Sequence, residues 1–164
     1  MSMHLGWLMV GCIVMLLTPL NALAQDPSET QIKTKTPEPT RLYFGMWTEH
    51  LKRPGIALDN NWLVGLAHRG FFGATFKNSF GRRAFTAGYQ RALISSSHGL
   101  LTTSLGFRVG AVTGYDGRFM RLARDLPVLP LISAYGNVDV GRVGVEVAYT
   151  FVVVSVAVSY RLGG

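Results

Sequence analysis

The fold of this chain is decided by the sequence VVVSVAVSYRL at positions 152–162. Every second residue, starting from Val152, is aliphatic or aromatic, whereas the residues between them include Ser155, Ser159 and Arg161. Successive side chains of a β-strand point to opposite faces, so this stretch predicts a strand with one apolar face and one small or polar face. The sequence RVGVEVAY at positions 142–149 repeats the pattern. A soluble β-sandwich also produces alternation, but so pure an apolar face favours a barrel in lipid, which is apolar outside and polar within.

Six further stretches are rich in aromatic, β-branched and glycine residues, as strands of a small barrel are. Eight strands form the smallest common membrane barrel, whose lumen is filled by side chains or holds one small ligand. We therefore expect an all-β fold, an eight-stranded antiparallel transmembrane β-barrel over residues 41–164. The expected strands are Leu42–Leu51, Trp62–Gly70, Phe71–Ser79, Phe85–Leu93, Leu100–Thr113, Val128–Tyr135, Arg142–Tyr149 and Phe151–Leu162.

The N-terminus predicts export from the cytoplasm. Positions 5–20 are apolar apart from Thr18, and the sequence ALA at positions 22–24 offers a small-x-small cleavage site. We interpret residues 1–24 as a secretory signal peptide. Two alternatives stay open: Cys12 would fit a lipoprotein signal, and the apolar run approaches the length of a membrane-spanning helix. Export together with a barrel predicts the outer membrane of a Gram-negative bacterium.

Composition narrows the classes of function. The sequence QDPSETQIKTKTPEPT at positions 25–40 is polar, contains three prolines and predicts a flexible arm. The net charge is +7 at pH 7, but an exported protein meets anionic lipid headgroups rather than nucleic acid. We expect a monomer with membrane lipids as partners, namely phospholipid and lipid A or lipopolysaccharide. The only cysteine is Cys12, and His50, His68 and His98 lack metal-ligand spacing, so no disulfide, metal or cofactor is expected.

Three charged residues fall on the polar faces of predicted strands: Arg108, Glu146 and Arg161. A charge that faces lipid costs about 2–4 kcal/mol at the bilayer midplane, so all three are expected to point into the lumen. An unpaired buried charge is expensive, which predicts an Arg–Glu network there. The basic stretches Gly81–Arg83 and Gly117–Asp125 are expected in loops, either as solvated charge or as sites for lipid phosphate.

Several short motifs carry a resemblance to a known family. The sequence FKNSF at positions 76–80 is followed by AGY at positions 87–89, WTEH stands at 47–50, and LPVLPL stands at 126–131. Together they resemble the lipid A palmitoyltransferase (PagP) family of small outer-membrane barrels. That family has a Phe-Lys-Asp-Ser-Trp motif followed by Ala-Gly-Tyr, a Trp-His strand and a proline-rich strand entrance. The resemblance covers about positions 44–147.

The resemblance implies a function and a site. In that family a His, the motif Asp and the motif Ser are implicated in moving a palmitoyl chain from phospholipid to lipid A. Position by position, this implies catalytic roles for His50, Asn78 and Ser79, with Asn78 in place of the family's Asp. A neutral amide does not accept a proton as a carboxylate does. Pro127 and Pro130 correspond to the family's lateral gate, and proline donates no ladder hydrogen bond.

Two classes of function remain open from the sequence. One is an acyltransferase that acts on lipid A. The other is a non-enzymatic small outer-membrane barrel that binds lipid or serves a structural role. An apolar lumen that is open at the outer end favours the first, because an acyl chain needs such a channel. A lumen filled by charged side chains favours the second.

Overall fold

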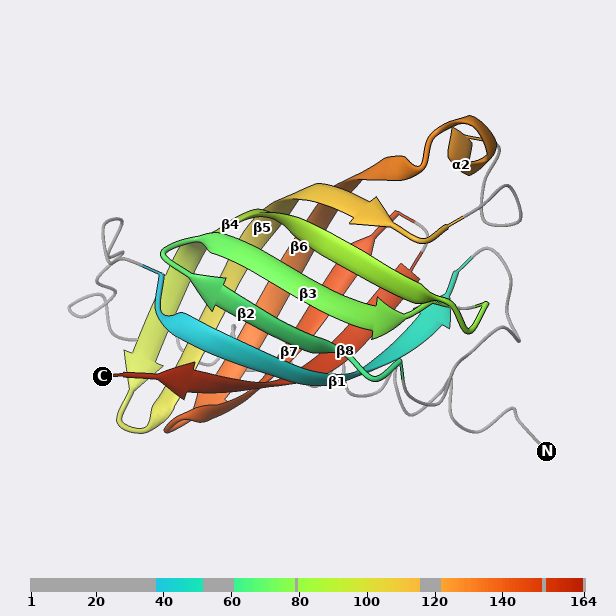
Figure 1. Ribbon diagram of the computed structural model, residues 1–164. Coiled ribbons are helices and arrows are strands. Elements are labelled where there is room, and N and C mark those ends of the chain that lie inside the picture. The colour runs from blue at the N-terminus through green and yellow to red at the C-terminus, as the bar shows by residue number, and fades with distance from the viewer. Residues whose placement is uncertain (1–37, 52–60, 79, 116–121, 152, 164) are drawn as a thin grey trace. The chain divides into compact units, whose positions relative to one another are not determined.

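The computed structural model describes residues 38–51, 61–78, 80–115, 122–151 and 153–163. This part of the chain forms a closed barrel of eight antiparallel strands that follow one another in chain order (Figure 1). The predicted fold class is therefore confirmed. The expected signal peptide, the expected arm up to Pro37, and Ser79 lie outside the described residues. The strands are β1 (Thr40–His50), β2 (Val64–His68), β3 (Phe71–Lys77), β4 (Arg83–His98), β5 (Leu101–Thr113), β6 (Val128–Val140), β7 (Val143–Thr150) and β8 (Val153–Leu162).

The described residues include one short helix, α2 (Leu122–Asp125), which lies between β5 and β6. Among the described residues, no helix has the length and apolar character needed to cross a membrane.

The barrel closes where β1 pairs with β8, from Thr40 opposite Leu162 to His50 opposite Val153. The register of β1 shifts at Gly45, which has a φ of +58°. Such a bulge bends the strand and moves the inward-pointing set of side chains by one position. A second shift lies in β4 between Ala92 and Ile94.

The alternation of burial follows the alternation of sequence. In β7, Gly144, Glu146 and Ala148 are buried, whereas Val143 and Tyr149 are exposed. The exposed set gives the barrel an apolar outer surface, as a barrel that faces lipid requires, and such a barrel is compatible with an outer-membrane protein. Among the large apolar residues exposed on the strands are Phe44, Val64, Leu66, Phe71, Phe85, Leu93, Ile94, Leu105, Val109, Val128, Ile132, Val140, Val143, Val145 and Tyr149.

The two ends of the barrel differ in the length of their connections. At one end, which also holds the start of β1 and the end of β8, tight turns join β2 to β3, β4 to β5 and β6 to β7 (Figure 1). We call this the short-turn end. The opposite, long-loop end carries the connections from β1 to β2 and from β5 to β6. Outer-membrane barrels place short turns in the periplasm and longer loops outside the cell.

Three strands extend two or more residues beyond their expected bounds. β1 begins at Thr40, which the sequence assigned to the polar arm, and Glu38 just before it accepts a hydrogen bond from the backbone N–H of Ala92. β4 continues to His98. The register shift after Ala92 inverts the alternation of apolar and polar residues, and the expected strand therefore ended too early. β6 continues to Val140, so the turn lies at Gly141.

Candidate functional site

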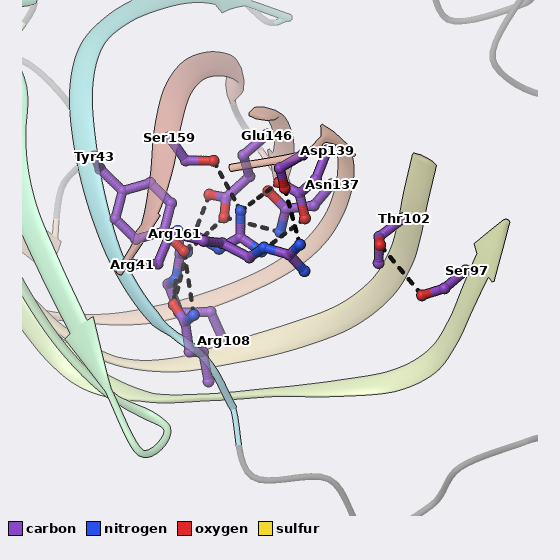
Figure 2. Close-up of polar contacts among 12 residues, drawn as sticks. Arg41, Tyr43, Ser97, Thr102, Arg108, Asn137, Asp139, Glu146, Ser159 and Arg161 are labelled. Carbon is purple, nitrogen blue, oxygen red and sulfur yellow. Dashed lines mark hydrogen bonds and ion pairs between the residues drawn. The ribbon is translucent and has the colours of Figure 1, made fainter. Parts of the chain in front are cut away.

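The centre of the lumen is occupied by the guanidinium of Arg108. Its Nη2 lies 3.0 Å from a carboxylate oxygen of Glu146, and Nε and Nη2 donate to Oε1 of Gln90 at 3.1 and 2.8 Å (Figure 2). The guanidinium carbon also lies 4.9 Å from the ring centre of Phe72 and 5.4 Å from that of Tyr135. Cation–π contact and a carboxylate partner together offset the loss of hydration of this charge.

A second buried ion pair lies nearer the short-turn end, between β1 and β6. Arg41 donates to both carboxylate oxygens of Asp139, at 2.6 and 3.0 Å, and to the hydroxyl of Ser159 at 2.9 Å. The bidentate geometry matches the fork of a guanidinium to the two oxygens of a carboxylate. We call the two groups together the lumen plug, which consists of Arg41, Tyr43, Phe72, Gln90, Arg108, Tyr135, Asn137, Asp139, Glu146 and Ser159.

Glycines on the inner face make room for the lumen plug. A Cβ at Gly106 would lie 2.7 Å from the ring of Tyr135, and one at Gly88 would lie 2.9 Å from the ring of Phe72. A Cβ at Gly144 would collide with the carboxylate of Asp139. At Gly88 and Gly106 the backbone of the paired strand lies closer still, since the nearest atoms are the carbonyl oxygens of Val109 and Arg91. These glycines are therefore packing positions, against both the paired backbone and the plug side chains.

The structure brings two of the three predicted lumen charges together and separates the third. Arg108 and Glu146 are paired as described above. Arg161 instead lies at the short-turn end, where its Nη2 donates to the backbone carbonyl of Gly141 at 2.9 Å. Because Arg161 is the second-to-last residue of β8, its guanidinium lies at the rim of the barrel rather than at its centre. Arg161 lines a hollow of about 450 Å³ together with Pro39, Gly141, Arg142 and Gly163.

The half of the lumen toward the long-loop end has a different character. A cluster of buried apolar residues extends into it, and this cluster includes Tyr43 and Phe72 of the lumen plug. Polar side chains are buried toward this end as well, namely those of Thr48, Asn61 and Asn78. Just past the end of β5, burial raises the pKa of Tyr115 to about 12. The apolar cluster consists of Tyr43, Leu63, Ala67, Phe72, Phe76, Ala84 and Ala157, with Met46, Ala74, Val112, Tyr115 and Leu131 packed against it.

Asn78 is fully buried at the long-loop end, directly after β3. Its Oδ1 accepts hydrogen bonds from the backbone N–H groups of Phe80 and Arg82 at 2.9 and 3.0 Å. Its Nδ2 donates to the carbonyl oxygen of Gly114 at 2.5 Å. The side chain therefore holds the β3–β4 connection in shape and ties it to the end of β5, as asparagine often does in turns. It has the contacts of a structural residue rather than those of a catalytic base.

The other two residues implied by the resemblance are placed differently. His50 ends β1 and pairs with Val153 of β8. After the shift at Gly45 it shares the inward face of Met46 and Thr48. His50 and Asn78 thus lie at the same end of the barrel, because β1 and β3 run in the same direction. Ser79 lies outside the described residues.

The two prolines mark the start of β6. Pro127 lies in a bend before the strand, and Pro130 pairs with Ala111 of β5. The ladder between β6 and β7 begins only at Ala134, opposite Tyr149. Residues 128–133 of β6 therefore pair with β5 on one side, and the ladder between the described residues of β6 and β7 does not reach them. The strand begins at Val128, just after Pro127, but its ladder to β5 runs unbroken through Pro130. The ladder to β7 is shorter because β7 ends at Thr150.

Of the lumen plug, sequence reasoning identified only Arg108 and Glu146. Asp139 was not considered because the sixth strand was expected to stop at Tyr135, and Arg41 stood at the expected border between arm and barrel. The signal was present, since Arg41 and Tyr43 share one face of β1 and Asn137 and Asp139 share one face of β6. Among the described residues, no group of three or more His, Cys, Asp or Glu side chains is placed to hold a metal ion.

No protein-family model matches the chain, and no curated protein matches it significantly.

Proposed function

We propose that this protein is a non-enzymatic outer-membrane barrel that binds membrane lipid. The observation that carries the proposal is the division of the lumen. The short-turn half is filled by the charged lumen plug. A buried apolar cluster extends toward the long-loop end, next to the segment of β6 that the ladder to β7 does not reach, and the buried polar side chains at that end are those of Thr48, Asn61 and Asn78. An acyl chain that enters beside Pro130 would contact apolar side chains such as Leu131 and Val112, and the ion pairs would stop it from passing further.

The lumen plug also argues against a channel. Arg108 is held by a carboxylate, an amide and aromatic rings, so its side chain fills the middle of the barrel. Eight-stranded barrels enclose just enough space for such side chains. We therefore expect no ion conductance from the purified protein in planar bilayers.

Lipid binding is tested by native mass spectrometry of the full chain, expressed with its N-terminus intact and purified from outer membranes. We expect phospholipid or lipid A to remain bound after the detergent shell is removed. A matched variant, Leu131→Asp, places a charge in the apolar half of the lumen and should lower lipid retention. Wild-type protein that is recovered from the soluble periplasm, or that retains no lipid, would contradict the proposal.

Acyl transfer from phospholipid to lipid A is the second candidate function. The observation that favours it is the position of His50 at the same end as Asn78, next to the apolar half of the lumen. The engagement of Asn78 with backbone groups weighs against it. The two candidate functions are distinguished by incubating the protein with lipid A and with phospholipid that carries a labelled palmitoyl chain. Transfer that is lost in His50→Ala would replace the non-enzymatic proposal with the acyltransferase.

A further inference from the structure

Two cationic side chains face each other on the outside of the barrel at the long-loop end. Lys77 is the last residue of β3, Arg83 is the first of β4, and the two are directly paired across the ladder. Both are exposed, and each is next in sequence to a buried inward-facing residue, Phe76 and Ala84, so both point outward. Side chains in directly paired positions start about 4.5–5.5 Å apart at Cβ, and like charges there repel each other.

No carboxylate among the described residues forms an ion pair with either cation. The ion pairs in this part of the chain engage Arg41 and Arg108, both inside the lumen. We call Lys77 and Arg83 the outer cation pair. Two like charges in register, with no counter-charge among the described residues, are stabilised when an anion binds between them.

Asn78 lies between the two members of the outer cation pair, directly after Lys77, and braces the connection that leads to Arg83. This buried side chain accepts from the backbone N–H of Arg82 and donates to Gly114. Its backbone N–H donates to the carbonyl of Arg82 at 2.8 Å, and its carbonyl accepts from Gly81 at 2.9 Å. These bonds fix backbone atoms on both sides of the connection, so ligand binding has to order mainly the side chains of Lys77 and Arg83.

Exposed aromatic side chains flank the outer cation pair. Phe85 follows Arg83 on the same outward face and is 58% exposed. Trp62 is 64% exposed, and the residue before it, Asn61, accepts a hydrogen bond from the backbone N–H of Lys77. Aromatic residues of this kind form the girdles of membrane barrels at the level of the lipid headgroups. The outer cation pair therefore lies where headgroup phosphates lie.

We propose that Lys77 and Arg83 bind a phosphate group of lipid A on the outer surface of the barrel. The choice of ligand depends on the orientation of the barrel. The long-loop end faces the outside of the cell, and the outer leaflet of the membrane there consists of phosphorylated glycolipid. A guanidinium and an ammonium that converge on one phosphate form charge-assisted hydrogen bonds, which are short and strong. The inference rests on the proposed outer-membrane location, but not on lipid entry into the lumen.

The test compares lipid binding by full-length variants in detergent micelles. Binding of bis-phosphorylated lipid A is titrated by native mass spectrometry for the wild type and for the double variant Lys77→Ala/Arg83→Ala. The matched control Arg91→Ala/Arg142→Ala removes the same charge from exposed positions toward the short-turn end. We expect the double variant to lose roughly tenfold or more in apparent affinity. We expect the control to retain the affinity of the wild type, and Lys77→Arg to retain most of it.

Three further ligands identify the recognised group. Lipid A stripped of its phosphates should bind equally to the wild type and the double variant, and inorganic phosphate should compete only weakly. Phosphatidylglycerol should show a smaller difference between the two proteins than lipid A does. Equal lipid A affinity of the wild type and the double variant would overturn the inference, as would an equal loss in the control. Retention of phospholipid by the double variant, measured in parallel, reports on the proposed lumenal function separately.

Discussion

The side-chain amide of Asn78 donates a hydrogen bond to the backbone carbonyl of Gly114, and so links the β3–β4 connection to the end of β5. The same side chain accepts from two backbone N–H groups of its own connection. This position needs a group that both donates and accepts. An asparagine supplies both functions, whereas an ionised aspartate supplies acceptors only. The amide at this position is therefore explained by the packing of the long-loop end.

Asn78→Asp should destabilise the barrel rather than activate it. At neutral pH the variant would place a buried carboxylate oxygen against the carbonyl oxygen of Gly114, with the donor lost. An unsatisfied buried group costs about 1–3 kcal/mol, and more when it is charged. The urea midpoint for unfolding in micelles measures this effect. At acidic pH the protonated carboxyl donates again, so the loss should become smaller.

The control for this variant is Lys77→Ala, one residue away, which removes an exposed side chain and should leave the urea midpoint close to that of the wild type. An Asn78→Asp protein as stable as the wild type at neutral pH would show that the contact with Gly114 is unimportant. A gain in palmitoyl transfer in the same variant would support the acyltransferase instead.

Gly144→Ala should weaken the barrel by displacing Asp139 from Arg41. The added methyl would collide with the Asp139 carboxylate and approach the Ser159 hydroxyl to 3.0 Å. Overpacking of this kind costs about 1–3 kcal/mol. The matched control is Gly73→Ala, because a Cβ there meets nothing within 4 Å. Heat-modifiable gel migration and urea unfolding compare the two, and equal stability of both variants would contradict the collision.

The ion pair in the middle of the lumen plug predicts a strong asymmetry between single and double variants. Glu146→Leu alone leaves the buried Arg108 charge without its carboxylate and should cost about 3–5 kcal/mol of unfolding free energy. The double variant Arg108→Met/Glu146→Leu removes both charges and should recover most of that loss. Urea unfolding of the two single variants and the double variant closes a thermodynamic cycle. Additive losses would show that the two side chains do not interact.

The fold was accessible from the sequence because β5, β7 and β8 alternate over long stretches, and a period of two residues assigns both the strands and their faces. Strand ends were harder to predict. The bulge in β4 after Ala92 inverts the alternation, so Ile94–His98 lost its periodic signal. Register shifts of this kind depend on pairing with a neighbouring strand, which a single stretch of sequence does not report.

The site was only partly accessible for a related reason. Arg108 and Glu146 stood on predicted inward faces, and both lie in the lumen plug. Arg161 occupies the same kind of face, but its distance from the barrel centre depends on the tilt of β8 and on its pairing with β1. The role of Asn78 depends on Gly114, which is 36 positions away in sequence. A motif shows residue types, whereas the direction of each hydrogen bond follows from the packed structure.

The last prediction concerns lipid entry between β6 and β7. Their ladder begins with Ala134 opposite Tyr149, so continuing the register by one step places Ser133 opposite Thr150. Cysteines at these two positions should form a disulfide that ties β6 to β7 beside the segment of β6 that pairs only with β5, since directly paired positions suit disulfide geometry. The only cysteine of the natural sequence is Cys12. The substitution Cys12→Ser removes this thiol from any protein that keeps its N-terminal segment. Uptake of a spin-labelled phospholipid by delipidated protein is then measured with and without reductant. If lipid enters here, oxidation of Ser133→Cys/Thr150→Cys should slow uptake, and reductant should restore it.

The control Val138→Cys/Val145→Cys places a disulfide where the ladder already exists, and its uptake should not depend on reductant. Uptake by the oxidised Ser133→Cys/Thr150→Cys protein at the rate of its reduced form would show that lipid reaches the lumen by another route.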